Sequence, residues 1–319
     1  MFDSVIGIDL GTSNILVYSK NKGLVVNEPS VIAVDKKTKK IVAVGSEARD
    51  MIGRVPDNIT VIKPLSQGVI SDFTMTEALL KYFIHSLKKK GFSKPRISIC
   101  VPSGVTEVER RAVEDAAFGA GAKKVQIFEE PIAAAIGAGI DVSESCGRMV
   151  VDIGGGTTDV AVVSLGGIVI CTSLKVAGND LDQAVISFIR KQYNVVIGEA
   201  TAERIKKEVG CVWDRPEVLS INITGRDLVT GLPKSLNIKS TETTIMFKEI
   251  ANRMVDTIYS ILEQTPPELA ADILVGGIIL TGGTSLLYGV DRLIKHRLDI
   301  DCILVDKPLE SVVLGLISQ

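Results

Sequence analysis

The chain has 319 residues, of which 46% are hydrophobic and 23% are charged, and its formal net charge is −2. This length suffices for two domains or for one large two-lobed unit, and the composition is ordinary for a soluble globular protein. The small negative charge provides no general attraction to nucleic acid, so a nucleic-acid-binding protein is disfavoured.

The sequence also argues against a histidine-based site, a disulfide framework and a membrane-spanning segment. With only two histidines, far apart in the sequence, a histidine-based metal site or catalytic triad is not expected. The five cysteines are scattered without C-x₂-C pairs, which favours buried free thiols in a reducing cytosol. No uncharged apolar run approaches about 18 residues, so neither a transmembrane helix nor a signal peptide is predicted.

The first element in the chain is a predicted β-hairpin that carries an acid. Residues 5–18 read VIGIDLGTSNILVY: an apolar run, Asp9, a glycine, three polar side chains and a second apolar run. Two strand-like runs joined by a short glycine-containing connection are typical of a hairpin. Residues 32–62, with short apolar runs and a lysine-rich stretch, are expected to form a small insertion.

After residue 63 the pattern changes to alternating helices and strands. A helix is predicted from Thr74, because Thr74 and Glu77 have capping-box spacing and apolar residues recur at helical intervals. The elements predicted next are a strand over 97–101, a helix over 106–119, a strand over 125–128 and a helix over 132–138.

A second predicted hairpin carries the clearest chemical signal. Residues 150–167 read VVDIGGGTTDVAVVSLGG, so an apolar strand ends at Asp152 and three glycines precede a second apolar strand. Glycine lets backbone N–H groups approach a ligand closely, and a concave array of amides suits phosphate oxygens. Asp152 is placed to hold a cation, directly or through water, as in many Mg²⁺ sites. Taken alone, the stretch fits an ordinary loop equally well.

The two hairpins share one order of residues: apolar strand, acid, glycine, hydroxyl cluster, apolar strand. Counting from Asp9 to Asp152, the copies are 143 positions apart. A duplicated domain with one phosphate-binding hairpin in each half would close around a nucleotide from both sides. The repeat therefore favours a functional interpretation of both glycine loops.

The second half repeats the alternation of strands and helices, which predicts helix-covered sheets in two similar lobes. The elements predicted are a helix over 181–192, an insertion over 199–245 with a helix over 201–209 and strands near 218–223 and 235–239, a helix over 246–264, strands over 278–280 and 302–305, and a helix over 309–316. Gly282 and Gly283 are expected to open another helix, whose N-terminus suits an anion or an adenosine, or is a plain βα turn. Rossmann and P-loop fingerprints do not occur in the sequence.

Together these residues resemble the actin/Hsp70/sugar-kinase ATPase superfamily, and within it the MreB family of bacterial actins. The resembling stretches, which span essentially the whole chain, are GIDLGTSN, NEPSVIAV, ICVPSGVTEVERRAVEDAA, EEPIAAAIGAG, DIGGGTTDVAVVSLGG, GRDLVTGLPK and TPPELAADI. The resemblance implies an α/β, actin-like ATPase fold with two duplicated RNase H-like lobes, each with a smaller inserted subdomain. It also implies binding of ATP or ADP with Mg²⁺.

The resemblance also implies how the chain divides. The core of lobe I is expected to comprise residues 1–31, 63–140 and 306–319, with 32–62 as its small insertion. The core of lobe II is expected to comprise residues 141–180 and 246–305, with 181–245 as its insertion.

Site residues follow from the resemblance, position by position. The acids expected to hold Mg²⁺, through water, are Asp9 and Asp152. The residues expected to bind the nucleotide are Thr12, Ser13, Asn14, Gly154, Gly155, Gly156, Thr157, Glu203, Lys206, Gly282, Gly283, Thr284 and Ser285. The residues expected to serve catalysis are Glu130, Thr158 and Asp159. Glu130, which would orient the attacking water, is equally compatible with a plain role as an acid at a helix N-terminus.

Two positions depart from the family pattern. Asp159 stands where most of the family has Glu, so its carboxylate is withdrawn by one methylene, about 1.5 Å. A small displacement near the attacking water can be costly in rate, which leads to the hypothesis of slow hydrolysis or slow phosphate release with binding intact. Thr284 stands where a third glycine is usual, which changes the backbone contacts expected of that turn.

A membrane contact is a further implication. The family binds the cytoplasmic membrane face through an apolar loop, an N-terminal amphipathic helix or both, and a first strand starting by residue 4 leaves no room for the helix. The candidate loop is residues 88–96, where Phe92 lies among basic side chains that include Lys90 and Lys94. This patch suits anionic lipid, and it equally suits a solvated helix end with Phe92 turned inward.

The sequence thus predicts a cytoplasmic, ATP-binding bacterial actin-like protein with slow ATP hydrolysis. The resemblance implies filaments of this chain, antiparallel and double, at the inner membrane face, a role in cell shape, and other shape or cytoskeletal proteins as partners. The alternative is a monomeric ATPase of the same superfamily. A chaperone type would need a client-binding domain after the last predicted helix, and a small-molecule kinase would need a catalytic base, for which the sequence offers no candidate.

Overall fold

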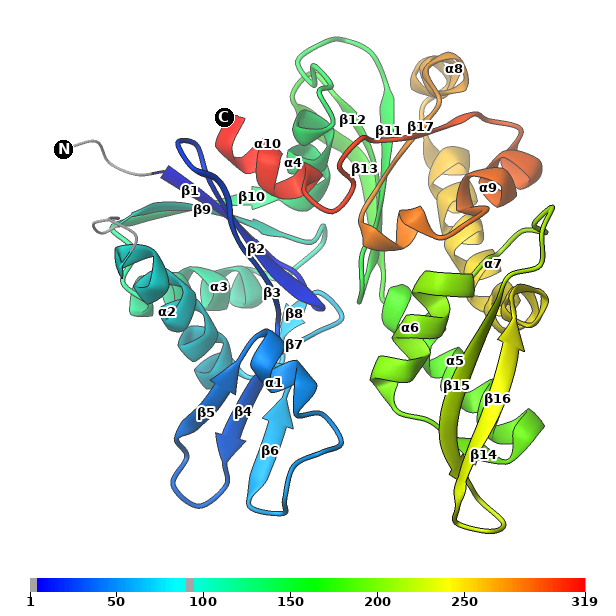
Figure 1. Ribbon diagram of the computed structural model, residues 1–319. Coiled ribbons are helices and arrows are strands. Elements are labelled where there is room, and N and C mark those ends of the chain that lie inside the picture. Colours follow the sequence, from blue (N-terminus) through cyan, green and yellow to red (C-terminus); the bar gives the residue numbers. More distant parts are fainter. Residues whose placement is uncertain (1–4, 90–94, 319) are drawn as a thin grey trace.

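The structure, a computed structural model, describes residues 5–89 and 95–318. Two lobes lie side by side, each built on a five-stranded mixed sheet (Figure 1). The strands of the first sheet, in spatial order, are β10 (Lys124–Glu129), β9 (Arg96–Val101), β1 (Val5–Leu10), β2 (Asn14–Ser19) and β3 (Gly23–Pro29). Those of the second are β13 (Gly167–Leu174), β12 (Thr158–Ser164), β11 (Arg148–Ile153), β17 (Ile278–Thr281) and β18 (Cys302–Leu304).

The two sheets have the same topology, which confirms the predicted duplicated α/β fold. In each sheet, three consecutive strands form an antiparallel meander, and two later strands run parallel to its first strand. The predicted hairpins are β1–β2 and β11–β12, at the centre of the two sheets. Asp9 and Asp152 therefore lie near the carboxyl ends of central strands, where open α/β sheets bind ligands.

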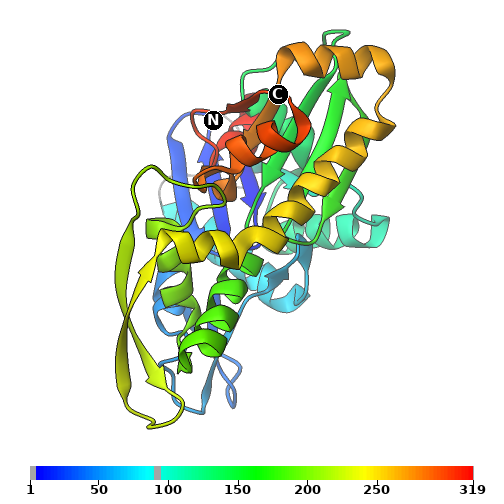
Figure 2. The same cartoon turned by 90° about the vertical axis from the view of Figure 1, so that its right-hand side faces the viewer.

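Helices cover the sheets because their apolar faces complete the cores of the lobes. Those of the first lobe are α2 (Phe73–Lys89) and α3 (Glu107–Gly119). Those of the second are α7 (Ser240–Gln264), α8 (Pro267–Gly276) and α9 (Val290–Leu298). In contrast, α5 (Gly178–Tyr193) packs on α7, on α6 (Glu199–Val209) and on the first strand of the smaller sheet described next. Figure 2 shows α7 crossing the outer side of the second lobe, where it packs on β12 and β13.

Smaller sheets extend from one end of both lobes (Figure 1). Beside the first lobe are β4 (Ile32–Asp35), β5 (Ile41–Val44), β6 (Ile59–Ile62) and α1 (Ser46–Asp50), followed by the short hairpin of β7 (Leu65–Ser66) and β8 (Val69–Ile70). Beside the second are β14 (Val195–Val196), β15 (Ser220–Asp227), β16 (Pro233–Lys239) and α6 (Glu199–Val209). One ion pair joins the two sides: Lys63 Nζ lies 2.5 Å from Glu199 Oε2.

Two local predictions about helix starts were wrong. The helix predicted from Thr74 begins at Phe73, and Asp72 Oδ1 accepts a hydrogen bond from the backbone N–H of Met75 at 3.0 Å, so Asp72 does the capping. Gly282 and Gly283 lead only into η1 (Gly283–Leu286), a four-residue 3₁₀ turn, rather than into an α-helix. In addition, no helix was predicted over α8, although its start at Pro267 is a favoured first position of a helix.

Two short helices connect the lobes at the top of the view in Figure 1. They are α4 (Glu130–Gly137) and α10 (Ser311–Ser318), which pack on each other and on strands of both sheets. A Cβ placed on Gly137 would collide with the carbonyl oxygen of Ser311, and one on Gly315 with that of Ala133. The helix backbones therefore touch at two glycines, an approach that any side chain prevents.

This crossing predicts the sign of a stability change. Alanine favours the helical conformation by about 1 kcal/mol relative to glycine. If there were space at this position, Gly315→Ala would therefore stabilise α10. Because the Cβ collides with the backbone of α4, we expect instead a loss of about 1–3 kcal/mol in the free energy of unfolding, measured by chemical denaturation. The control is Gly167→Ala, where the nearest atom is Ser164 O at 3.9 Å, and it should stay within about 0.5 kcal/mol. A Gly315→Ala variant as stable as wild type contradicts the tight crossing.

Candidate functional site

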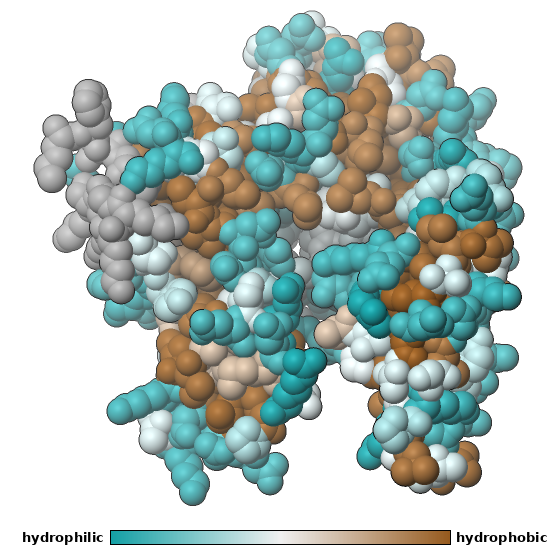
Figure 3. Space-filling view, in the orientation of Figure 1, coloured by the Kyte–Doolittle hydropathy of each residue, from teal (hydrophilic) through white to brown (hydrophobic). Residues whose placement is uncertain are grey.

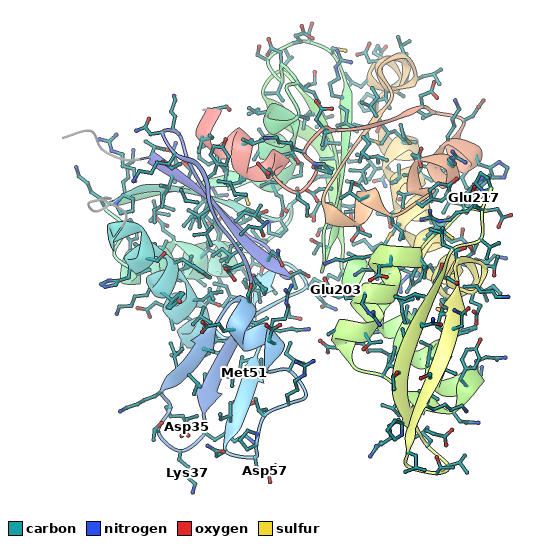
Figure 4. The ribbon with its side chains drawn as sticks, in the orientation of Figure 1. Asp35, Lys37, Met51, Asp57, Glu203 and Glu217 are labelled. Atoms are coloured by element: carbon teal, nitrogen blue, oxygen red, sulfur yellow. The ribbon has the colours of Figure 1, made fainter. Side chains whose placement is uncertain are left out.

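A cavity of about 480 Å³ lies between the lobes, and Figure 3 shows the face hollowed there. Its wall contains most of the predicted site residues: Asp9, Thr12, Ser13, Asn14, Glu130, Asp152, Gly154, Gly155, Gly156, Thr157, Glu203, Lys206, Gly282, Gly283 and Thr284. In Figure 4, Glu203 lies at the edge of the cleft on α6. The fold thus brings together side chains that the sequence separates by more than 200 positions.

The two hairpin turns meet directly at this cavity. A Cβ on Gly155 would collide with Ser13 Oγ, and one on Gly156 would lie 2.6 Å from Thr12 Oγ1. Ser13 Oγ also donates a hydrogen bond across the cleft to Asn179 Oδ1 at 3.1 Å. The glycines are therefore required where the loops of the two lobes face each other, and their peptide groups form part of the cavity wall.

The glycine turn after β17 is fastened to the second hairpin. Thr284, which replaces the usual third glycine, donates its hydroxyl to the carbonyl of Gly154 at 2.7 Å. Ser285 is buried and donates to the carbonyl of Gly282 at 2.6 Å, so its hydroxyl stabilises the turn. The described residues that line the cavity include Thr284 but not Ser285.

Lys206 reaches the cavity from α6 in a fixed position. Its Nζ lies 2.8 Å from both Asp182 Oδ2 and the carbonyl oxygen of Gly178. Burial raises the pKa of Asp182, and the charge of Lys206 opposes that shift. A lysine held by a buried carboxylate is a preorganised charge, because little side-chain freedom remains to be lost when a ligand binds.

Four buried acidic side chains lie near one another where the two hairpin turns meet. Burial raises the pKa of Asp9 to about 6, although the thiol of Cys100, 3.6 Å away, donates to its carboxylate and opposes the shift. The pKa values of Glu130 and Asp152 lie well above the usual range, first because of burial and then because of repulsion from the neighbouring acids. Asp159 stands opposite Asp152 in the β11–β12 register, and burial raises its pKa to about 6.

This cluster fits a divalent cation. Buried carboxylates that repel one another are relieved by positive charge, and carboxylate oxygen is the ligand that Mg²⁺ prefers. In the described part of the chain, no three His, Cys, Asp or Glu side chains are grouped closely enough to ligate a metal ion together. That spacing suits Mg²⁺, which keeps several of its waters and uses few protein ligands.

Thr158 and Asp159 lie on β12 behind the residues that line the cavity. The hydroxyl of Thr158 donates to the carbonyl of Val176 at 2.8 Å, so it serves the sheet. Asp159 is 1% exposed, and its Oδ1 is buried without a hydrogen-bond partner among the described residues. Neighbouring groups on Ser173, Thr157 and Ser103 hydrogen-bond to the same carboxyl and partly offset the effect of burial on its pKa.

Other lining residues were not predicted from the sequence. Gly210 follows α6 directly, and a glycine after a helix was a signal that could have found it. Arg215 and Tyr288 come from loops far apart in sequence and had no local signal. The predicted membrane residues Lys90, Phe92 and Lys94 lie outside the described residues. Among the residues that are described, no helix has the length and apolarity to cross a bilayer.

Paired sheets of this topology with a cleft between them define the actin-like ATPase fold. The family model described as MreB/Mbl protein matches residues 3–319, so the chain belongs to the MreB/Mbl family. The cell shape-determining protein Mbl of Bacillus cereus is 49% identical over 316 residues, covering 99% of this chain and 95% of that protein. The cell shape-determining protein MreB of Escherichia coli is 46% identical over 321 residues, covering 99% and 92%.

A solved structure agrees with the fold over nearly the whole chain. The crystal structure of MreB5 of Spiroplasma citri bound to ADP has a TM-score of 0.95 and 39% identity, and covers 99% of this chain and 95% of that one. A structure of the same protein bound to AMPPNP is equally similar, with a TM-score of 0.95.

The raised pKa of Asp9 predicts a pH-dependent stability. The unfolded chain ionises this carboxyl near pH 4 and the folded chain near pH 6, so without metal the fold loses stability as pH rises through this window. In EDTA, Asp9→Asn should therefore raise the free energy of unfolding by about 1–3 kcal/mol at pH 8 and by much less at pH 4. Asp141→Asn, at an exposed acid whose pKa is lowered by Ser143, is the control and should give no gain at pH 8. A loss of stability for Asp9→Asn at pH 8 contradicts the account.

Proposed function

We propose that the chain binds ATP or ADP with Mg²⁺ in the cleft and assembles into filaments as a bacterial actin-like cytoskeletal protein. The observation that carries this proposal is the meeting of two glycine loops from duplicated hairpins beside four buried carboxyls. The ADP and AMPPNP named for the Spiroplasma citri structures support nucleotide binding at this cleft. The name shared by the relatives, cell shape-determining protein, supports a role in cell shape.

The residues at the phosphate end have distinct proposed tasks. The peptide N–H groups of residues 155–157 and the side chains of residues 12–14 would hold the phosphates, whereas the N–H of Gly154 is used within the turn, where it donates to the carbonyl of Thr157 at 2.9 Å. Asp9 and Asp152 would hold Mg²⁺ through its waters. Bound Mg²⁺ supplies positive charge to the transferring phosphoryl group, which together with positioning provides most of the catalysis in such reactions. Held there, the cation would lower the pKa of the neighbouring acids, and Glu130 would then be ionised at neutral pH.

Glu130 is the proposed residue that orients the attacking water. It begins α4, lines the cavity and lies near enough to Asp152 and Asp159 for their charges to raise its pKa. Asp159 is too far back on β12 to line the cavity, and its shorter side chain is proposed to hold this water less well than Glu in the same position. The consequence is slow hydrolysis, or slow phosphate release, with nucleotide binding intact.

The wider assembly is proposed from family membership. The chain divides into the two lobe cores and two insertions with the boundaries given above, ATP closes the lobes and favours polymerisation, and the filaments are antiparallel and double. They lie at the cytoplasmic face of the membrane through residues 88–96, where many weak anchors along a filament add up by avidity. Other shape or cytoskeletal proteins are proposed as partners.

Pelleting combined with phosphate release tests this function. Wild type is expected to pellet with ATP and to release phosphate slowly. Glu130→Gln should still bind ATP, with phosphate release lowered by about 100-fold, because an oriented base contributes that much to proton transfer. Asp159→Glu should release phosphate several-fold faster than wild type. ADP and a non-hydrolysable ATP analogue serve as nucleotide controls.

Two outcomes contradict the proposal. If no nucleotide yields a pellet at high protein concentration while phosphate is still released, the chain is a monomeric ATPase and the filament function is wrong. If Glu130→Gln releases phosphate at the wild-type rate, Glu130 does not orient the water. If Asp159→Glu releases phosphate more slowly than wild type, only the explanation of slow hydrolysis by Asp159 is wrong.

A further inference from the structure

A stacked pair of side chains closes one end of the cavity. The guanidinium of Arg215 lies over the ring of Tyr288, with Cζ 4.1 Å from the ring centroid, and both residues line the cavity. Lys206 and Thr284 lie beside the second hairpin turn, because the hydroxyl of Thr284 donates to the carbonyl of Gly154 and Lys206 Nζ lies 2.8 Å from that of Gly178. Arg215 lies farther from that turn, since it contacts Gly210, one helical turn beyond Lys206. From this arrangement the Arg215 end is where the nucleoside of a bound nucleotide would lie.

One nitrogen of the Arg215 guanidinium has a hydrogen-bond partner and another is buried without one. Its Nη2 donates to the carbonyl of Gly210 at 3.0 Å, at the C-terminal end of α6. Its Nε is buried and has no hydrogen-bond partner within residues 5–89 and 95–318. A buried donor without a partner is costly, which calls for an explanation such as a ligand or a water.

Capping of α6 explains only part of this geometry. A cation near a helix C-terminus is favourable, and the contact of Nη2 with Gly210 satisfies one of its last carbonyls. Capping of α6 does not require the guanidinium of Arg215 to lie over the Tyr288 ring. It also does not require the Nε of Arg215 to be buried without a partner. A planar guanidinium held against an aromatic ring offers a rigid surface on which a second flat group can lie.

We propose that Arg215 is a nucleoside-binding residue, and that the pair Arg215–Tyr288 forms the wall against which the base of the bound nucleotide stacks. The inference rests on the proposed nucleotide binding, and it names a residue that contacts the nucleoside part of the bound nucleotide. Arg215 then contributes to affinity through the base and not through the phosphates, because it lies farther from the second hairpin turn than Lys206 and Thr284 do.

Calorimetric titration with ATP and with inorganic tripolyphosphate, both with Mg²⁺, tests the proposal. Arg215→Ala is expected to weaken ATP binding by about tenfold, which corresponds to about 1.4 kcal/mol. Tripolyphosphate, which has no base, should bind wild type and variant equally. Arg215→Lys keeps the charge but loses the plane, so it should not restore ATP affinity.

The chain offers a matched control in Arg292. Its guanidinium also lies near the Tyr288 ring, at 5.1 Å, but Arg292 is not among the described residues that line the cavity. Arg292→Ala should therefore leave ATP affinity unchanged. The melting temperature of each variant, measured without nucleotide, separates loss of binding from loss of folding.

The outcomes separate the inference from the function on which it rests. If wild type does not bind ATP, the proposed function fails. If wild type binds ATP and Arg215→Ala binds it equally, or if the variant loses ATP and tripolyphosphate binding to the same extent, the stacking role is overturned. Recovery of ATP affinity in Arg215→Lys would likewise overturn it, because capping by a cation would then suffice.

Discussion

The structure depends on the burial of four carboxyls at one point between two lobes. Asp9, Asp152, Asp159 and Glu130 come from two copies of one hairpin and from the helix that follows β10, and their pKa values are raised by burial. Such an arrangement works against folding at neutral pH unless a cation is present. The proposed cation, shared with phosphates held by the surrounding glycine loops, would relieve this repulsion.

The remaining architecture holds the two halves of this site together. A small apolar core joins the lobes, with residues from β9 on one side and from β11, β12 and β17 on the other, and α4 and α10 close it by their glycine contact. The cleft itself is crossed by the Ser13–Asn179 hydrogen bond and, nearer the inserted sheets, by the exposed pair of Lys63 and Glu199. Since exposed ion pairs contribute about 0–1 kcal/mol, the Lys63–Glu199 pair adds little to the attachment that the apolar core provides.

Much of the fold and half of the site could be predicted from sequence because their signals are local. Each hairpin contains its strands, its acid and its glycines within 18 residues, and the repeat revealed the duplication. The start of α2 was misplaced because Thr74 has the capping-box spacing, whereas Asp72 is where the chain turns into the helix. Arg215 and Tyr288 could not be found this way, since their two loops meet through a backbone bridge between Cys211 and Tyr288, for which the sequence carries no local signal. The roles of Thr158 and Ser285 likewise depend on which way a hydroxyl points, and both point to backbone carbonyls.

The central claim is that nucleotide and divalent cation bind together at the four carboxyls. Calorimetric titration of wild type with ATP, in Mg²⁺ and in EDTA, tests it most directly. The account predicts that wild type binds ATP in Mg²⁺ and that its affinity for ATP is at least about tenfold lower in EDTA. Without the cation, the phosphates would add negative charge to a site that already holds four acids. Equal affinity under the two conditions would contradict it, because the carboxyls would then have no cation to hold.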